Sequence, residues 1–164
     1  MTERVTIRPA QQRDVAAIAT MVNEYAAQNV MLPRTPESIA LAIDDFLVAV
    51  TDRDRVIGCG SLKEYSPSLA EIAALAVTKE AQGRGVGRAV VERLEKLALS
   101  RGIESVFALT LTPPFFESLG YAVVDRSLYP EKIRRDCVGC PRRFGCGEVT
   151  VGRTLRPAAL EVAA

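Results

Sequence analysis

The sequence predicts one α/β (α+β) domain in which an antiparallel N-terminal meander of strands is flanked by helices. The first observation is the element order that the hydrophobic pattern gives, β, α, α, three β, α, β, α, β. The second is size and composition: 164 residues with 48% hydrophobic and 25% charged residues are typical of one globular domain. The third is that no internal repeat or long linker divides the chain. We therefore expect a single domain over residues 1–155 and a C-terminal tail over 156–164.

The first 45 residues predict a strand and two helices. Residues 5–8 form a strand candidate, and Asp14 stands at a helix N-cap position before apolar residues at helical spacing, namely Val15, Ile18, Val22 and Tyr25. A second helix is predicted from Pro36 through Asp44, because proline suits the first helical position.

The central and C-terminal segments predict the remaining strands and helices. Strands at 46–50, 56–65 and 69–77 are separated by polar turns, which indicates the meander. Val86, Val90, Leu94 and Leu97 then recur at helical spacing until Gly102 gives a stop signal. A strand at 105–111, a short helix at 114–119 and a strand at 121–124 follow. Beyond Asp125 we expect an irregular, cysteine-rich segment and a last strand at 148–154.

Composition restricts the classes of partner and of chemistry. The 21 Lys+Arg and 20 Asp+Glu residues nearly cancel, so the broad basic surface of a nucleic-acid or anionic-membrane binder is not expected, and small molecules are the expected partners. The longest apolar run, residues 72–77, is too short to cross a bilayer, and the start lacks a signal-like stretch; we expect a cytoplasmic protein. Because the chain has no histidine, any general base must be a carboxylate, Lys, Tyr, Cys or a water relay.

The glycine-rich segment Gln82-Gly83-Arg84-Gly85-Val86-Gly87-Arg88 lies between a predicted strand and a predicted helix. Glycines let the backbone approach a ligand, and a helix start offers unpaired N–H groups to an anion such as a pyrophosphate. A tight turn without a ligand is the simpler alternative. A Walker loop would need Gly-Lys-Ser/Thr, and a Rossmann fingerprint would follow the first strand of a parallel series, so both fit poorly.

The segment resembles the Gln-x-x-Gly-x-Gly motif of the GNAT N-acetyltransferases, read here at Gln82, Gly85 and Gly87. The resemblance covers roughly residues 5–124 and implies the GNAT fold with a mixed central sheet. It also implies acetyl-CoA as co-substrate, held by the loop residues Gln82, Arg84, Gly85, Val86, Gly87, Arg88 and Ala89. Backbone groups of Leu75 and Val77 would face the thioester carbonyl and the pantetheine, which resembles the oxyanion contact of the family.

A second landmark of the resemblance is the segment Phe115-Phe116-Glu117-Ser118-Leu119-Gly120-Tyr121. In the family this short helix lies beside the pantetheine thiol, and many members carry a Tyr where Phe116 stands, to protonate the leaving thiolate. Phe cannot donate a proton. Because a thiol is a tolerable leaving group as thiolate, water or a nearby hydroxyl is expected to suffice.

Glu71 is the candidate general base. It is the single carboxylate in the apolar strand segment from Ala70 to Val77. Burial would make it costly to ionise, so we expect either that Glu71 faces a wet cleft or that burial favours its protonated form. The segment resembles the Glu-bearing fourth strand of GNAT histone acetyltransferases, where the Glu acts through water. The simpler alternative is a solvated Glu at a sheet edge.

The acceptor is inferred from a resemblance to short, stand-alone N-acetylglutamate synthases. The resemblance lies in four segments, residues 31–34, 45–49, 56–60 and 107–110. Glutamate brings two carboxylates, and Arg is the side chain best shaped for bidentate carboxylate binding, so Arg34 is the first candidate. Thr110 is a second substrate candidate, as a hydrogen-bond partner at a strand end. An exposed Arg and an ordinary strand Thr are the alternatives.

The cysteine-rich loop at 136–147 carries Cys137, Cys140 and Cys146. The Cys-x-x-Cys spacing allows two sulfurs to bind one tetrahedral zinc ion, with Cys146 as third ligand and a fourth from Cys59, a carboxylate, water or a second chain. Reduced thiols or a redox-labile pair are the alternative.

Three functions therefore remain open. The first is an N-acetylglutamate synthase, which makes the first compound of arginine biosynthesis. The second is a GNAT enzyme acting on a protein N-terminus, a polyamine or a drug. The third is a non-catalytic acetyl-CoA or amino-acid sensing domain. A homodimer also stays open.

Overall fold

The computed structural model describes residues 3–141 and 147–155, which divide into two compact units. The first unit comprises the chain up to residue 63 together with residues 72–97. The second comprises residues 64–71 and the chain from residue 98 onward. The boundaries fall inside three elements, β3 (Val56–Ser66), β4 (Leu69–Val77) and α3 (Val86–Ser100), so these contribute to both units.

The strands of the described residues form the mixed sheet that the sequence predicts. In the first unit, β1 (Thr6–Pro9) pairs antiparallel with β2 (Phe46–Val50), and β2 pairs antiparallel with β3. In the second unit, residues Leu69–Glu71 of β4 pair parallel with β5 (Ser105–Thr110). There β5 and β6 (Ala122–Val123) both pair antiparallel with β7 (Val149–Thr154). The strand order is β1-β2-β3-β4-β5-β7-β6.

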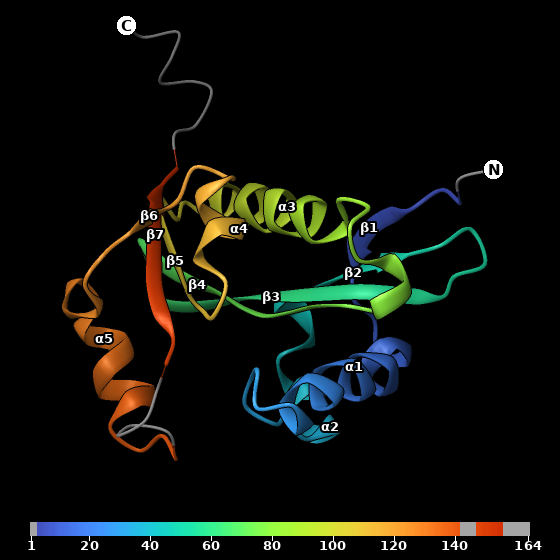
Figure 1. Ribbon diagram of the computed structural model, residues 1–164, viewed down its shortest axis with the longest axis horizontal. Helices are drawn as coiled ribbons and strands as arrows, with labels where there is room; N and C mark the ends of the chain where they lie inside the picture. The colour runs from blue at the N-terminus through green and yellow to red at the C-terminus, as the bar shows by residue number, and fades with distance from the viewer. Residues whose placement is uncertain (1–2, 142–146, 156–164) are drawn as a thin grey trace, which may run out of the picture. The chain divides into compact units, whose positions relative to one another are not determined.

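In the first unit, helices cover both faces of the strands (Figure 1). Helices α1 (Val15–Ala27) and α2 (Pro36–Leu41) lie on one face, and the apolar side chains between them and β2 form a core that includes Ile18, Val22, Ile39, Phe46 and Val48. On the other face, α3 approaches β3 closely. A Cβ at Gly58 would lie 3.0 Å from Val86, and one at Gly60 would lie 2.9 Å from Leu94, so glycine is required for this approach.

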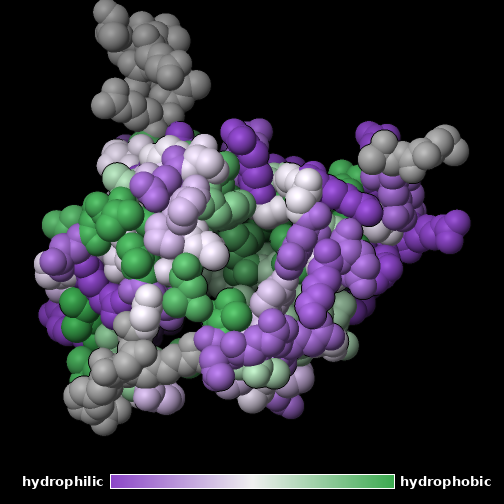
Figure 2. Space-filling view, in the orientation of Figure 1, coloured by the Kyte–Doolittle hydropathy of each residue, from purple (hydrophilic) through white to green (hydrophobic). Residues whose placement is uncertain are grey.

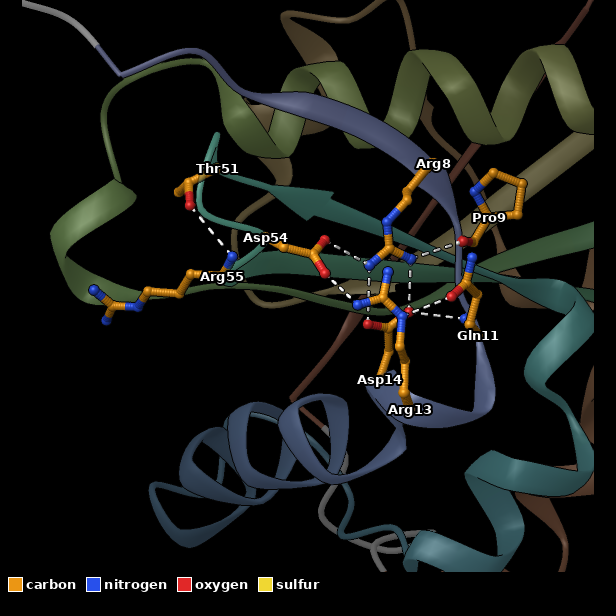
Figure 3. A network of polar contacts seen from close by, with 8 residues as sticks. All are labelled: Arg8, Pro9, Gln11, Arg13, Asp14, Thr51, Asp54 and Arg55. Carbon is orange, nitrogen blue, oxygen red and sulfur yellow. Dashed lines mark hydrogen bonds and ion pairs between the residues drawn. The ribbon is translucent and has the colours of Figure 1, made fainter.

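A charged network anchors the start of α1, as Figure 3 shows. Asp14 is only 4% exposed, and its carboxylate accepts hydrogen bonds from the Gln11 amide at 2.8 Å and from both terminal nitrogens of Arg8 at 2.7 and 3.1 Å. Asp14 precedes α1 as predicted, but its side chain bonds back toward β1 instead of capping α1. Asp54 binds both Arg8 and Arg13 at the exposed edge of the network.

The second unit has an aromatic core. Tyr65, Leu69, Phe107 and Tyr129 are buried together, and the Phe107 and Tyr129 rings stack with centroids 4.2 Å apart. On the surface, Figure 2 shows hydrophobic side chains where α5 (Pro130–Lys132), β6 and β7 are drawn in Figure 1. The exposed apolar residues of this unit include Leu111, Val123, Leu128 and Val138.

The largest departure from the predicted elements is the segment after Asp125. We expected irregular chain, but it forms a 3-10 turn at Arg126–Leu128, α5, and a π-helical turn at Ile133–Cys137. Asp125 caps the first turn and Pro130 begins α5. The segment lacks an apolar period because its contacts are made by Tyr129, Lys132 and Asp136, so periodicity could not reveal it.

Smaller departures concern element ends. Helix α2 ends at Leu41 and a 3-10 turn, Ile43–Asp45, replaces its expected last turn. The short helix α4 spans Pro113–Glu117, and β6 has two residues where four were expected. No helix among the described residues is both long and apolar enough to cross a membrane.

Candidate active site

The glycine-rich loop has the backbone geometry that an anion site needs. Gly83 and Gly85 adopt φ values of +78° and +79°, which side-chain-bearing residues rarely adopt, and a Cβ at either would meet no atom within 4 Å. The amide of Ala89 bonds to the Gly85 carbonyl at 3.0 Å, so Gly85 caps α3. The three preceding amides, at residues 86–88, therefore have no partner inside the helix. They fit the pyrophosphate of a coenzyme.

The side chains beside this loop tie it to α1. Gln82 donates to the Tyr25 hydroxyl at 2.5 Å, and that hydroxyl donates to the Val77 carbonyl at 2.5 Å. The predicted pantetheine contact at Val77 must therefore use another backbone group or share this carbonyl. Arg84 is exposed, and Arg88 is paired with Glu92 at 3.0 Å. The buried hydroxyl of Thr78 has no hydrogen-bond partner among the described residues.

The backbone of β4 is distorted just before Leu75. Ala74 adopts φ +51°, an uncommon value for a residue with a Cβ. Its carbonyl accepts from the Cys59 thiol at 3.4 Å, and the Ala73 carbonyl accepts from Ser61 at 3.2 Å. These bonds hold the distortion, which redirects the peptide groups next to Leu75. The expected oxyanion contact at Leu75 stays a prediction.

Arg34 is half-buried, and its backbone is held in place by α1. The Asn23 side chain donates to the Arg34 carbonyl at 2.8 Å and accepts from the Arg34 amide at 3.0 Å. The guanidinium lies over the Phe46 ring, 5.8 Å from its centroid. Within the described parts of the chain, the guanidinium makes no hydrogen bond or ion pair. A guanidinium with unused donors has the geometry to bind a carboxylate, and the substrate role of Arg34 stays a prediction.

Glu71 is buried in the second unit and belongs to a cluster with three polar side chains. It is 7% exposed, and its Oε1 accepts from the Tyr65 hydroxyl and from Nζ of Lys132, each at 2.9 Å. Lys132 also donates to Asp136 at 3.0 Å, and the Tyr65 hydroxyl contacts Asp136 as well. The sequence reasoning offered a wet cleft or a protonated carboxylate. The structure adds a buried counter-charge, Lys132.

The cluster stabilises charged Lys132 and neutral Tyr65. Burial opposes the Lys132 ammonium, but the carboxylates of Glu71 and Asp136 outweigh this effect, so the pKa of Lys132 is raised. For Tyr65, burial is the main cause and the two carboxylates add to it, so the pKa of the phenol is raised. Tyr65 therefore stays a hydrogen-bond donor at neutral pH.

Phe116 and Thr110 lie in the second unit in apolar and locally bonded settings. Phe116 is 5% exposed and makes edge contacts with the rings of Phe115 and Tyr121, at centroid distances of 5.1 and 5.3 Å. The Thr110 hydroxyl accepts from the Thr112 amide at 2.9 Å and so closes the turn after β5. Their roles toward pantetheine and substrate stay predictions.

The predicted zinc ligands are only partly described. Cys137 and Cys140 are half-buried, and Cys146 lies outside the described residues. No group of three potential ligands suited to a metal occurs among the described residues. Burial raises the pKa of the Cys59 thiol to about 12, which keeps it protonated and disfavours it as a metal ligand.

Sequence reasoning missed the residues that surround the predicted ones. Lys132 and Asp136 lie more than 60 positions from Glu71 in a segment without an apolar period, so no spacing linked them to it. The i,i+4 spacing of Lys132 and Asp136 was a signal, but it is typical of any solvated helix face. The helical spacing predicts Tyr25 only as part of an apolar helix face, and nothing in the pattern singles out Asn23 in the same helix.

The comparisons with known proteins define the family. Residues 16–121 match the model of the acetyltransferase (GNAT) family, and the chain belongs to this family. It is an acetyl-CoA-dependent N-acetyltransferase with the GNAT fold.

Two relatives and one solved structure show which members of the family this chain is similar to. The chain is 40% identical over 149 residues to an uncharacterized N-acetyltransferase of Chlorobaculum tepidum, covering 91% of this chain and 96% of the relative. It is 32% identical over 124 residues to an amino-acid acetyltransferase of Mycobacterium tuberculosis, covering 74% and 71%. The N-acetylglutamate synthase of Neisseria gonorrhoeae, solved with coenzyme A and N-acetyl-glutamate, superposes with a TM-score of 0.85 at 28% identity, covering 96% of this chain and 36% of that one.

Proposed function

We propose that this enzyme transfers the acetyl group of acetyl-CoA to the α-amino group of L-glutamate, the first step of arginine biosynthesis. The choice of acceptor rests on Arg34. This half-buried cation lies over the Phe46 ring, and the Asn23 side chain holds its backbone on both sides. Its guanidinium donors are unused among the described residues. An acceptor with a carboxylate is the natural partner of such a group. The similarity to amino-acid acetyltransferases supports the same choice.

In the proposed reaction, Glu71 accepts a proton from the substrate α-ammonium, directly or through a water. The freed amine then attacks the thioester carbonyl, and a C–N bond forms. The tetrahedral intermediate loses its second nitrogen proton to water and collapses with cleavage of the C–S bond, which gives the N-acetyl amino acid and coenzyme A thiolate. The backbone near Leu75 stabilises the oxyanion. Because Phe116 has no proton to give, the thiolate takes a proton from water, and Glu71 returns its proton to solvent.

The amides at the start of α3 bind the coenzyme in this proposal. Replacing Gly85 by Leu should raise the KM for acetyl-CoA about 10- to 100-fold, since a side chain would enter the open space in which the amides face the anion. Gly102→Leu is a matched control: Gly102 has φ +77° and equally open surroundings, but it lies after α3. If Gly85→Leu and Gly102→Leu both fold and have equal KM values for acetyl-CoA, the loop does not bind the coenzyme.

The acceptor can be tested by screening free amino acids, peptides and polyamines for acetyl-CoA-dependent thiol release. L-Glutamate is the expected best acceptor. Arg34→Ala should raise the KM for glutamate by an amount equivalent to about 1.5–3 kcal/mol while the acetyl-CoA KM stays near wild type. Arg53→Ala, which removes an exposed arginine from the same unit, is the control. Faster turnover of a peptide or polyamine would favour the second function, and no turnover of any amine would favour a sensing domain.

A further inference from the structure

We propose that Lys132 is a positioning residue for Glu71: its ammonium fixes Oε1 of the carboxylate, which leaves Oε2 as the proton-accepting atom. This inference rests on the role of Glu71 in the proposed function. It adds a residue from a part of the chain, beyond β6, that lies outside the matched region of the family model.

The contacts of Glu71 are concentrated on one oxygen. Both the Tyr65 hydroxyl and the Lys132 ammonium bind Oε1, each at 2.9 Å. No hydrogen bond to Oε2 occurs among the residues that the structure describes. The Lys132 ammonium fixes the orientation of the carboxylate together with the Tyr65 hydroxyl, whose single proton is shared between Glu71 and Asp136. The second oxygen keeps its lone pairs for a substrate proton or a water.

Lys132 is itself fixed, so it acts as a rigid counter-charge. Its side chain is 13% exposed, it pairs with Asp136 at 3.0 Å, and its ammonium lies 5.8 Å from the centroid of the Tyr65 ring. Arg135 covers the same ring at 4.8 Å and donates to the Glu64 carbonyl. Restricting a long lysine side chain in this way has an entropic cost, and these contacts offset it.

The elements that contact Glu71 or its bonded partners in the described part of this unit support this arrangement. Strand β3 contributes the Tyr65 phenol, α5 contributes the Lys132 ammonium, and the π-helical turn contributes the Asp136 carboxylate. Strand β5 places Phe107, which has no charge, opposite Glu71. Lys132 is therefore a buried counter-charge in direct contact with the Glu71 carboxylate.

The test compares the pH dependence of kcat in wild type, Lys132→Met and Lys132→Arg, with the best acceptor found in the screen. Without the cation, the protonated form of a buried carboxylate is favoured. In Lys132→Met, the acidic limb of kcat should move to higher pH and kcat at neutral pH should fall about 10-fold or more, with the acetyl-CoA KM unchanged. Lys132→Arg keeps the charge and should restore most of the profile. Lys96→Met removes an exposed lysine from α3 and should change neither quantity.

The Glu71→Gln background separates the possible failures. If Lys132 acts through Glu71, then adding Lys132→Met to Glu71→Gln should cause no further loss of kcat. A slow Glu71→Gln enzyme together with an unshifted profile in Lys132→Met overturns the inference and leaves the base in place. A Glu71→Gln enzyme with wild-type kcat overturns both the role of Lys132 and the role of Glu71 as general base. If Lys132→Met does not fold, Lys132→Gln replaces it, because glutamine keeps a hydrogen-bond donor without the charge. An acidic limb of kcat that stays at the wild-type pH in Lys132→Gln overturns the inference.

Discussion

Two buried carboxylates, Asp14 in the first unit and Glu71 in the second, are each paired with a cation, but their oxygens are used differently. Both oxygens of Asp14 are bound by Arg8, and one also accepts a backbone amide. In Glu71, the Tyr65 hydroxyl and the Lys132 ammonium both bind the same oxygen, Oε1. A carboxylate bound on both oxygens is suited to holding a loop in place, whereas one with an unengaged oxygen is suited to accepting a proton. Burial with a salt bridge therefore does not by itself define a role.

Glu71→Gln should give the largest effect. The amide keeps the shape of the side chain and can still accept from Tyr65 and Lys132, but it cannot accept a proton. Because general-base catalysis typically contributes about 10²–10⁴ in rate, kcat should fall by that factor while the acetyl-CoA KM stays near wild type. The acidic limb of kcat should also flatten. Steady-state kinetics across pH measures both quantities.

Asp14→Asn is the matched control for this variant, since it neutralises a buried carboxylate of the first unit. It should leave kcat unchanged. A Glu71→Gln enzyme with near-normal kcat at every pH would show that Glu71, like Asp14, is not the general base. Substrate deprotonation in bulk water would then be the simpler mechanism.

The sequence predicted the parts of the site that are local in the chain. The proposed coenzyme loop is visible as a motif because its glycines alternate over a few residues and lie directly before the start of a helix. Most strands and the three longer helices were found for the same reason, since apolar spacing is a local property. Glu71 stood out as a charge in an apolar strand.

The environment of Glu71 could not be predicted in the same way. It is assembled from β3, β4 and the segment around Lys132, and side-chain pairs across more than 60 residues leave no periodic signal. The charged contacts of that segment also made it resemble irregular chain, so its helical turns were missed. The direction of the Asp14 side chain was missed for a related reason: a residue at an N-cap position is expected to cap, but Arg8 on β1 offered a stronger, charged partner.

The smallest of the expected effects concerns stability at the other carboxylate. Asp14→Asn should lower the free energy of unfolding by about 1–3 kcal/mol, because Arg8 loses a buried partner and the Gln11 amide loses its charged acceptor. Asp54→Asn is the control: it removes an exposed carboxylate from the same Arg8, and it should lower the free energy of unfolding less than Asp14→Asn does. Urea unfolding followed by circular dichroism measures both.

The pH dependence of this difference gives an independent check on Asp14. Burial alone would raise the pKa of Asp14, but the hydrogen bonds from Arg8 and the Gln11 amide outweigh it and lower the pKa below that of an unfolded aspartate. A carboxylate with a lowered pKa in the folded state stabilises the protein fully above the unfolded pKa, about 3.9, and this contribution is lost as pH falls through the lower, folded value. The gap in unfolding free energy between wild type and Asp14→Asn should therefore be constant from pH 7 to about pH 5 and shrink at more acidic pH. Other carboxylates are common to both proteins and cancel in the comparison. A gap that stays constant into strong acid would show that Asp14 stabilises the fold through neutral packing, and the contrast with Glu71 would then rest on the kinetic measurements alone.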